Sequence, residues 1–152
     1  MSIKISWLLE GQIVIAKVYG EVTLQDLKTG NEVIGDYMQQ SPYNHVHVIF
    51  DSTHITSVSI SAVQAIWELR YLRNPKMGCY LVYGMSQVFN NILTISSRLF
   101  TSLTRVQAMH AFRDLPHTLD FLQQFDKSLP DLQPLIQAYQ LKGNGLNSQP
   151  AT

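Results

Sequence analysis

The order of strand-like and helix-like segments is the feature that most constrains the fold of this 152-residue chain. Residues 3–9 and 13–19 are rich in β-branched and aromatic side chains, and Gly11 lies between them, which predicts an antiparallel hairpin. Helix-like and strand-like segments alternate after it. This order predicts an α/β fold with a single mixed β-sheet, in which the N-terminal antiparallel hairpin precedes parallel βα units and helices cover the sheet.

Capping residues and apolar spacing mark the later elements. Thr23 and Asp26 form a capping-box pattern at the start of a helix that Ser41-Pro42 closes, and Asp114 can cap another helix. The remaining expected elements are strands at residues 46–50, 80–83 and 105–112 and helices at 61–72, 88–99 and 132–139.

The length and the 45% apolar content fit one domain, which we place at residues 1–126. A C-terminal amphipathic helix is expected within residues 127–142, ending at Gly143. The small polar residues of 143–152 predict a disordered tail.

The charge balance excludes a polyanionic partner, because 11 basic residues face 11 acidic ones; we therefore expect no nucleic acid partner. The 14% charged content is low against the usual ~25%, so either much of the surface is neutral and polar or part of it is apolar and covered by another subunit. Of these two, we expect the second, a homodimer. No apolar run approaches the ~20 residues of a membrane span, and no signal-peptide pattern is present. We expect a cytoplasmic protein.

Residues 51–63 carry the most distinctive local pattern. An apolar strand ends at Asp51, a serine-rich loop follows, and an apolar helix is expected to begin near Ser61. Because the first amides of a helix lack partners within it, hydroxyl groups here predict a helix cap, a phosphorylation site or an anion-binding loop. This prediction requires a sharp turn after Asp51.

The arrangement resembles the STAS domain, the fold of the anti-sigma factor antagonists and of the SpoIIAA-like proteins. Residues 11–23 look like the first strands of that family, and Gly20-Glu21 matches the step that leads into its first helix. Asp51 matches the strand-ending aspartate. Residues 59–62 fall on the Asp-Ser-Ser-Gly step of the family, with Ser59 in place of the acidic residue and Ala62 in place of the glycine.

The resemblance implies a non-enzymatic regulatory module that binds a protein partner, either a kinase or an anti-sigma-like protein. It places Ser61 on the serine that a partner kinase phosphorylates in the antagonists. Ser61 is therefore the main phosphorylation candidate, with Ser59 and Ser57 beside it. The expected partner-binding residues are Asp51, Ser59, Ser61, Ala62 and Trp67. The alternative is that Ser59 or Ser61 serves only as an N-cap.

Two further kinds of site find less support in the sequence. His45 and His47 lie two apart on a strand and would face the same way, but no third ligand is nominated, so they are only weak metal candidates. Cys79 is the one cysteine and lies in an apolar run, which predicts a buried core residue. No catalytic set or cofactor motif is present, and we expect neither an enzyme nor a bound cofactor.

The aromatic residues leave a second function open. Most of them should belong to the core, but a subset could line a cavity for an apolar small molecule or acyl chain, as SpoIIAA-like proteins are suspected of doing. The residues in question are Trp67, Tyr71, Tyr80, Tyr83, Phe89 and Phe100. The alternative function is thus a carrier or sensor of an apolar ligand.

Overall fold

The N-terminal hairpin forms as the sequence predicts. In the computed structural model, which describes residues 2–84 and 104–147, β1 (Ser2–Leu9) pairs antiparallel with β2 (Ile13–Val22). Gly11 lies in the turn with a φ of 79°, a conformation that favours glycine. A Cβ atom at Gly11 would also lie 2.9 Å from the exposed ring of Tyr43, which would have to shift to accept a side chain here.

Three parallel strands extend the hairpin into one five-stranded sheet. They are β3 (Val46–Val58), β4 (Met77–Tyr83) and β5 (Met109–Phe112). The strands lie in the order β1-β2-β3-β4-β5, and among the described strands only the β1·β2 pair is antiparallel. The predicted mixed sheet is confirmed.

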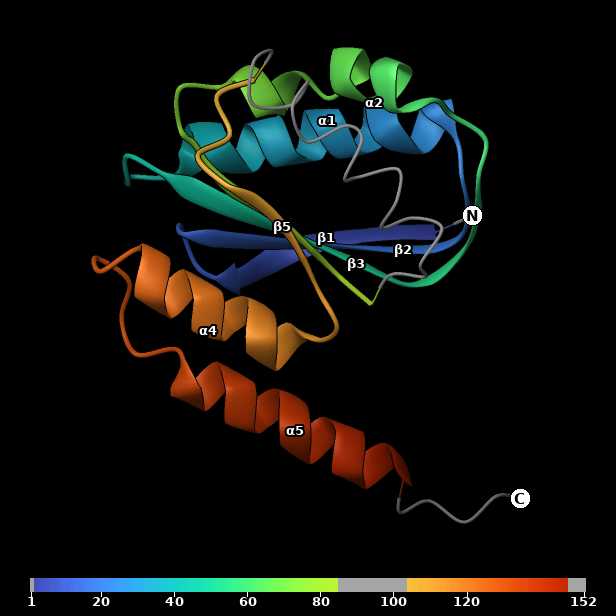
Figure 1. The fold of residues 1–152 in the computed structure, drawn as a ribbon. Helices are drawn as coiled ribbons and strands as arrows, with labels where there is room; N and C mark the ends of the chain where they lie inside the picture. Colours follow the sequence, from blue (N-terminus) through green and yellow to red (C-terminus); the bar gives the residue numbers. More distant parts are fainter. Residues whose placement is uncertain (1, 85–103, 148–152) are drawn as a thin grey trace.

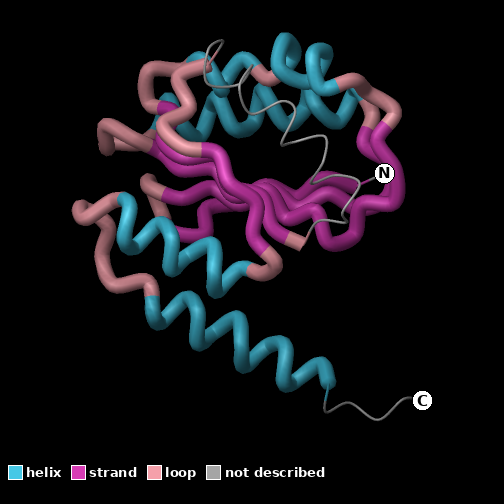
Figure 2. Tube along the Cα trace, in the orientation of Figure 1, coloured by secondary structure: helices cyan, strands magenta, loops and turns pink. Residues whose placement is uncertain are grey.

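Helices cover both faces of this sheet (Figures 1 and 2). On one face lie α1 (Leu24–Gln40), the short α2 (Ala62–Glu68) and a 3₁₀ turn, η1 (Arg70–Arg73). On the other lie α4 (Leu115–Phe125) and α5 (Gln133–Asn147), which pack against each other.

The core has two apolar layers because the interior strands are buried on both sides. In β2, Val14 and Ala16 belong to the cluster beneath α1 and η1, whereas Ile13 and Ile15 belong to the cluster beneath α4. Every residue of β4 is buried. Such strands are expected where helices cover both faces of a parallel sheet.

Several predicted boundaries were wrong. The strand predicted for residues 46–50 runs to Val58, because its β-branched second half pairs with the end of β2. The helix predicted for 61–72 ends at Glu68, where Leu69 leaves the helical region with a ψ of 75°. β4 is longer than predicted and β5 shorter. The helix predicted at 88–99 lies outside the described residues.

The C-terminal helix is also longer than predicted. It passes through Gly143 and continues to Asn147, so the expected disordered tail at 143–152 begins with five helical residues. This stretch contains Gly143 and Gly145, and each glycine costs a helix only about 1 kcal/mol. In the part of the chain that the structure describes, no helix is both long and apolar enough to cross a membrane.

Candidate functional site

The serine-rich segment begins as a β-ribbon. Beyond Asp51, β3 has no further partner residue on β4 and pairs only with the end of β2, up to Val58 opposite Val22. The sharp turn predicted after Asp51 therefore lies seven residues later, and the chain enters α2 through a short bend at residues 59–61.

Ser61 is the residue that begins α2. Its Oγ accepts a hydrogen bond from the Gln64 amide at 3.2 Å, and the Gln64 Oε1 accepts from the Ser61 amide at 3.3 Å. This reciprocal pair is a capping box, and Ser61 is exposed. The Ser-x-x-Gln spacing that produces the box was readable in the sequence, although Gln64 was not among the predicted site residues.

Ser59 and Ser57 have other roles. The Ser59 amide and hydroxyl both donate to the Val22 carbonyl, at 3.4 and 3.2 Å, so Ser59 ties the bend to the end of β2 and is not the helix cap. Ser57 is exposed within β3, in register with Glu21. Ser61 alone of the three serines lies at the helix start.

Exposed apolar side chains lie on α2, which Ser61 caps, and at the start of α1. Val63 and Trp67, one helical turn apart on α2, are 51% and 58% exposed, and Leu24 at the start of α1 is 38% exposed. The guanidinium of Arg73 lies 5.3 Å from the centre of the Trp67 ring and donates to the Trp67 carbonyl at 3.3 Å. We call the exposed set formed by Leu24, Ser59, Ser61, Val63 and Trp67 the bend surface.

Asp51 does not belong to this surface. It is only 8% exposed, its Oδ1 accepts from the Thr53 amide at 3.0 Å, and its carboxylate contacts the hydroxyl of buried Tyr83. Tyr83 belongs to the apolar cluster on the α4 face. The sequence-based grouping of Asp51 with Ser59, Ser61, Ala62 and Trp67 joined residues that the structure separates.

His45 and His47 do not form a pair. His45 is exposed, precedes the strand and contacts the Gln107 amide, whereas His47 is 1% exposed. Both ring nitrogens of His47 already have partners, the carboxylate of Asp126 and the backbone N–H of Cys79. Among the described residues, no three His, Cys, Asp or Glu side chains gather to hold a metal ion.

The remaining predicted residues are core residues or lie apart. Cys79 is buried, as predicted, and burial raises the pKa of its thiol to about 12, so it stays protonated at neutral pH. Tyr71 and Tyr80 are buried on the α1 face, but Tyr83 is buried on the opposite face. Trp67 is exposed, and Phe89 and Phe100 lie outside the described residues. The described aromatic residues therefore do not line a common cavity.

The sequence matches no family model and no curated protein. Three solved structures resemble the fold. The anti-sigma factor antagonist SpoIIAA in its unphosphorylated form is 12% identical, with a TM-score of 0.53 over 81% of this chain and 97% of that one. The Bacillus cell fate determinant SpoIIAA in its phosphorylated form is 13% identical, with a TM-score of 0.50 over 80% of this chain and 99% of that one.

The third structure is an uncharacterized protein of the DUF3478 family from Shewanella loihica PV-4, described as having a SpoIIAA-like fold. It is 16% identical, with a TM-score of 0.56 over 80% of this chain and 92% of that one. These likenesses agree with the strand order, the antiparallel first pair and the helices on both faces. The chain therefore has a SpoIIAA-like α/β fold.

Proposed function

We propose that this chain is a non-enzymatic, STAS-type regulatory module that binds a protein partner through the bend surface. The observation that carries the proposal is the exposed serine cap of α2 beside exposed Val63 and Trp67. Tryptophan is enriched among residues that dominate binding energy at protein interfaces. An exposed tryptophan beside further apolar side chains therefore supports a protein-binding surface.

We further propose that phosphorylation of Ser61 switches this binding off. A phosphate would bring a charge of about −1.5 to −2 to an apolar surface, and a partner covering that surface would have to desolvate the charge. Its oxygens could still accept from the first amides of α2, so the helix would keep its start. One of the structures with this fold is a phosphorylated form, which supports testing the same chemistry here.

The first test is phosphate mapping by mass spectrometry on protein isolated from its own cells. We expect phosphate on Ser61, whereas phosphate absent from Ser57, Ser59 and Ser61 would remove the switch. The second test is co-purification with Ser61→Glu, Trp67→Ala and the control Gln137→Glu, which adds the same charge to an exposed residue of α5. Wild type and Gln137→Glu should retain a partner that the other two lose; equal recovery by all four proteins would reject the bend surface.

A further inference from the structure

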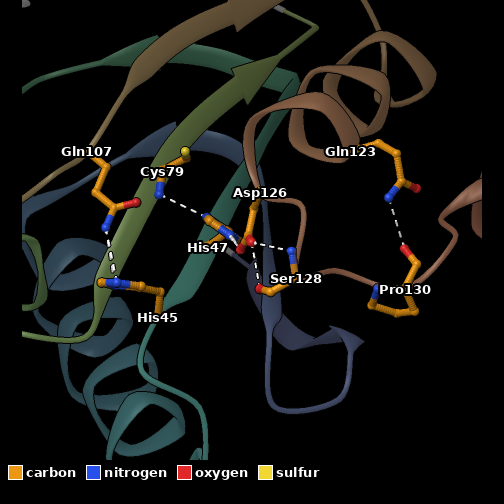
Figure 3. A network of polar contacts seen from close by, with 8 residues as sticks. All are labelled: His45, His47, Cys79, Gln107, Gln123, Asp126, Ser128 and Pro130. Atoms are coloured by element: carbon orange, nitrogen blue, oxygen red, sulfur yellow. Dashed lines mark hydrogen bonds and ion pairs between the residues drawn. The ribbon is translucent and has the colours of Figure 1, made fainter.

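A polar network on the opposite side of the sheet from α2 joins β3 and β4 to the end of α4 (Figure 3). His47 Nε2 lies 2.8 Å from Asp126 Oδ2, and the Cys79 N–H donates to His47 Nδ1 at 3.0 Å. Because Nδ1 accepts a hydrogen bond, the proton of the neutral ring lies on Nε2 and is donated to Asp126. Both ring nitrogens of His47 therefore take part in hydrogen bonds.

Asp126 links His47 to the turn between α4 and α5. It is the C-terminal cap of α4, and its Oδ1 accepts from the amide and the hydroxyl of Ser128 at 3.0 and 2.6 Å. The Gln123 side chain then donates to the Pro130 carbonyl at 3.1 Å and accepts from the Leu132 amide at 2.6 Å. Side chains of α4 thus fix the conformation of the whole turn.

We call residues 127–136 the strap, because they join α4 to α5 and cover part of the sheet. Leu129, Leu132 and Ile136 are buried in the same apolar cluster as Ile13 and Ile15 of β2. Most of the strap is otherwise exposed. The strap therefore closes an apolar layer while depending on a few anchoring contacts.

We propose that His47 and Asp126 form a proton-sensitive latch for the strap, which opens when His47 takes up a proton. The proton would have to enter at Nδ1, where it would face the Cys79 N–H at a distance that now holds a hydrogen bond. That contact would leave a buried donor unsatisfied, and the ring would carry its charge almost without access to water. Both costs vanish when the strap opens and the ring reaches solvent.

The charged and titratable groups around His47 differ in whether they favour its neutral or its protonated form. Burial lowers the pKa of His47 below 6.5, and this effect outweighs the attraction of the Asp126 carboxylate. His45 opposes the added charge, and the Cys79 thiol stays neutral. Burial alone would raise the pKa of Asp126, but hydrogen bonds from Ser128 and His47 hold it below 3.8, so Asp126 remains ionised above pH 5.

Linkage gives the size of the effect. With His47 free in the open form at its ordinary pKa of 6.5 and with a lowered pKa in the closed form, the opening equilibrium rises as the pH falls from 7.5 to 5.5, and the rise cannot exceed about tenfold. The lowered pKa sets the direction: the closed form is favoured most above pH 6.5, and this preference weakens as the pH falls toward the pKa of His47 in the closed form.

Hydrogen–deuterium exchange of the full chain at the two pH values tests this, with rates corrected for the intrinsic pH dependence. We expect a rise in exchange, of at most about tenfold, in peptides of the strap and no comparable rise in α1. An equal rise in both regions would mean global unfolding and would overturn the latch. His47→Gln should abolish the rise, whereas the control His45→Gln should keep it.

Should the His47 variant fail to fold, ¹⁵N NMR of the wild-type imidazole gives an independent answer. We expect the Nε2–H tautomer at pH 7.5 and a protonation that tracks the exchange of the strap. Protonation of His47 in a strap that remains protected would overturn the proposal. The bend surface lies on the other face of the sheet, so this result and the co-purification result are independent.

Discussion

Gly78 leaves room for the imidazole of His47 between two strands. A Cβ atom at residue 78 would lie 2.5 Å from His47 Nδ1 and 2.8 Å from its Cε1. The ring cannot move away without losing its bond to Asp126 or to the Cys79 amide. We therefore expect Gly78→Ala to lower the free energy of unfolding by about 2 kcal/mol, the usual cost of overpacking, measured by urea denaturation.

The matched control is Gly35→Ala in α1, where a Cβ atom would meet nothing within 4 Å. Alanine is the better helix former, so this variant should gain about 0.5–1 kcal/mol. A similar loss in both variants would show that contact with His47 is not the cause.

Single residues were predictable where their partners are close in sequence. The caps at Thr23 and Ser61 depend on residues three positions away, and their patterns are visible in the chain. The partner of His47 lies 79 positions away, so alternation along β3 could not reveal its burial. The same limit made His45 and His47 look like a pair.

The two capping boxes differ in burial, which makes their effects on helix stability separable. Asp26 is buried, and its Oδ2 accepts from both the amide and the hydroxyl of Thr23 at 2.8 Å. Within the described residues its Oδ1 has no partner. Thr23→Ala would remove one of the few donors of a buried carboxylate, so we expect a loss of about 2 kcal/mol.

Ser61→Ala in the exposed box of α2 should cost only about 0.5 kcal/mol, because water replaces the lost hydrogen bond. Thermal or urea unfolding of both variants measures the difference. If Ser61→Ala proved as costly as Thr23→Ala, Ser61 would be important for stability. A loss of partner binding in its variants could then result from unfolding and would not be evidence for a binding site.

The path of β3 shows why the candidate site was predicted only in part. The polar residues after Asp51 suggested a loop, yet Ile55 and Val58 are β-branched and pair with Gly20 and Val22 at the end of β2. Whether such a segment becomes a loop or a strand depends on the length of its partner strand, and the residues that set this length lie elsewhere in the sequence. The helix start at Ser61 was correct because its signal is local.

At the scale of the whole molecule, the order of elements was enough to predict the mixed sheet and its helical layers. The integration of the C-terminal segment was not predictable in this way. The sequence left open whether the helix beyond residue 126 docks on its own subunit or on a second one; in the structure, Leu129, Leu132 and Ile136 are buried with residues from β2, β3 and β4 of the same chain. Short amphipathic patterns do not say which surface they cover.

Truncation should therefore show whether the segment after Asp126 is a part of the core or a dispensable extension. Ending the chain at Asp126 removes three buried aliphatic side chains, each contributing about 1.5–3 kcal/mol, and we expect a loss on the order of 5 kcal/mol. Because a typical domain is stable by only about 5–15 kcal/mol, this fragment should be largely unfolded or molten. Urea denaturation and near-UV circular dichroism measure this directly.

The control is a chain that ends at Lys142, which keeps every residue of the strap. Leu141 and Lys142 are exposed, so the end of the described side chains on α5 contributes little burial. This variant should unfold within about 0.5 kcal/mol of the full chain, the range of ordinary surface changes. A stable, cooperative fragment 1–126 would instead show that the sheet closes its apolar layer without the strap, and the latch on His47 would then have nothing essential to hold.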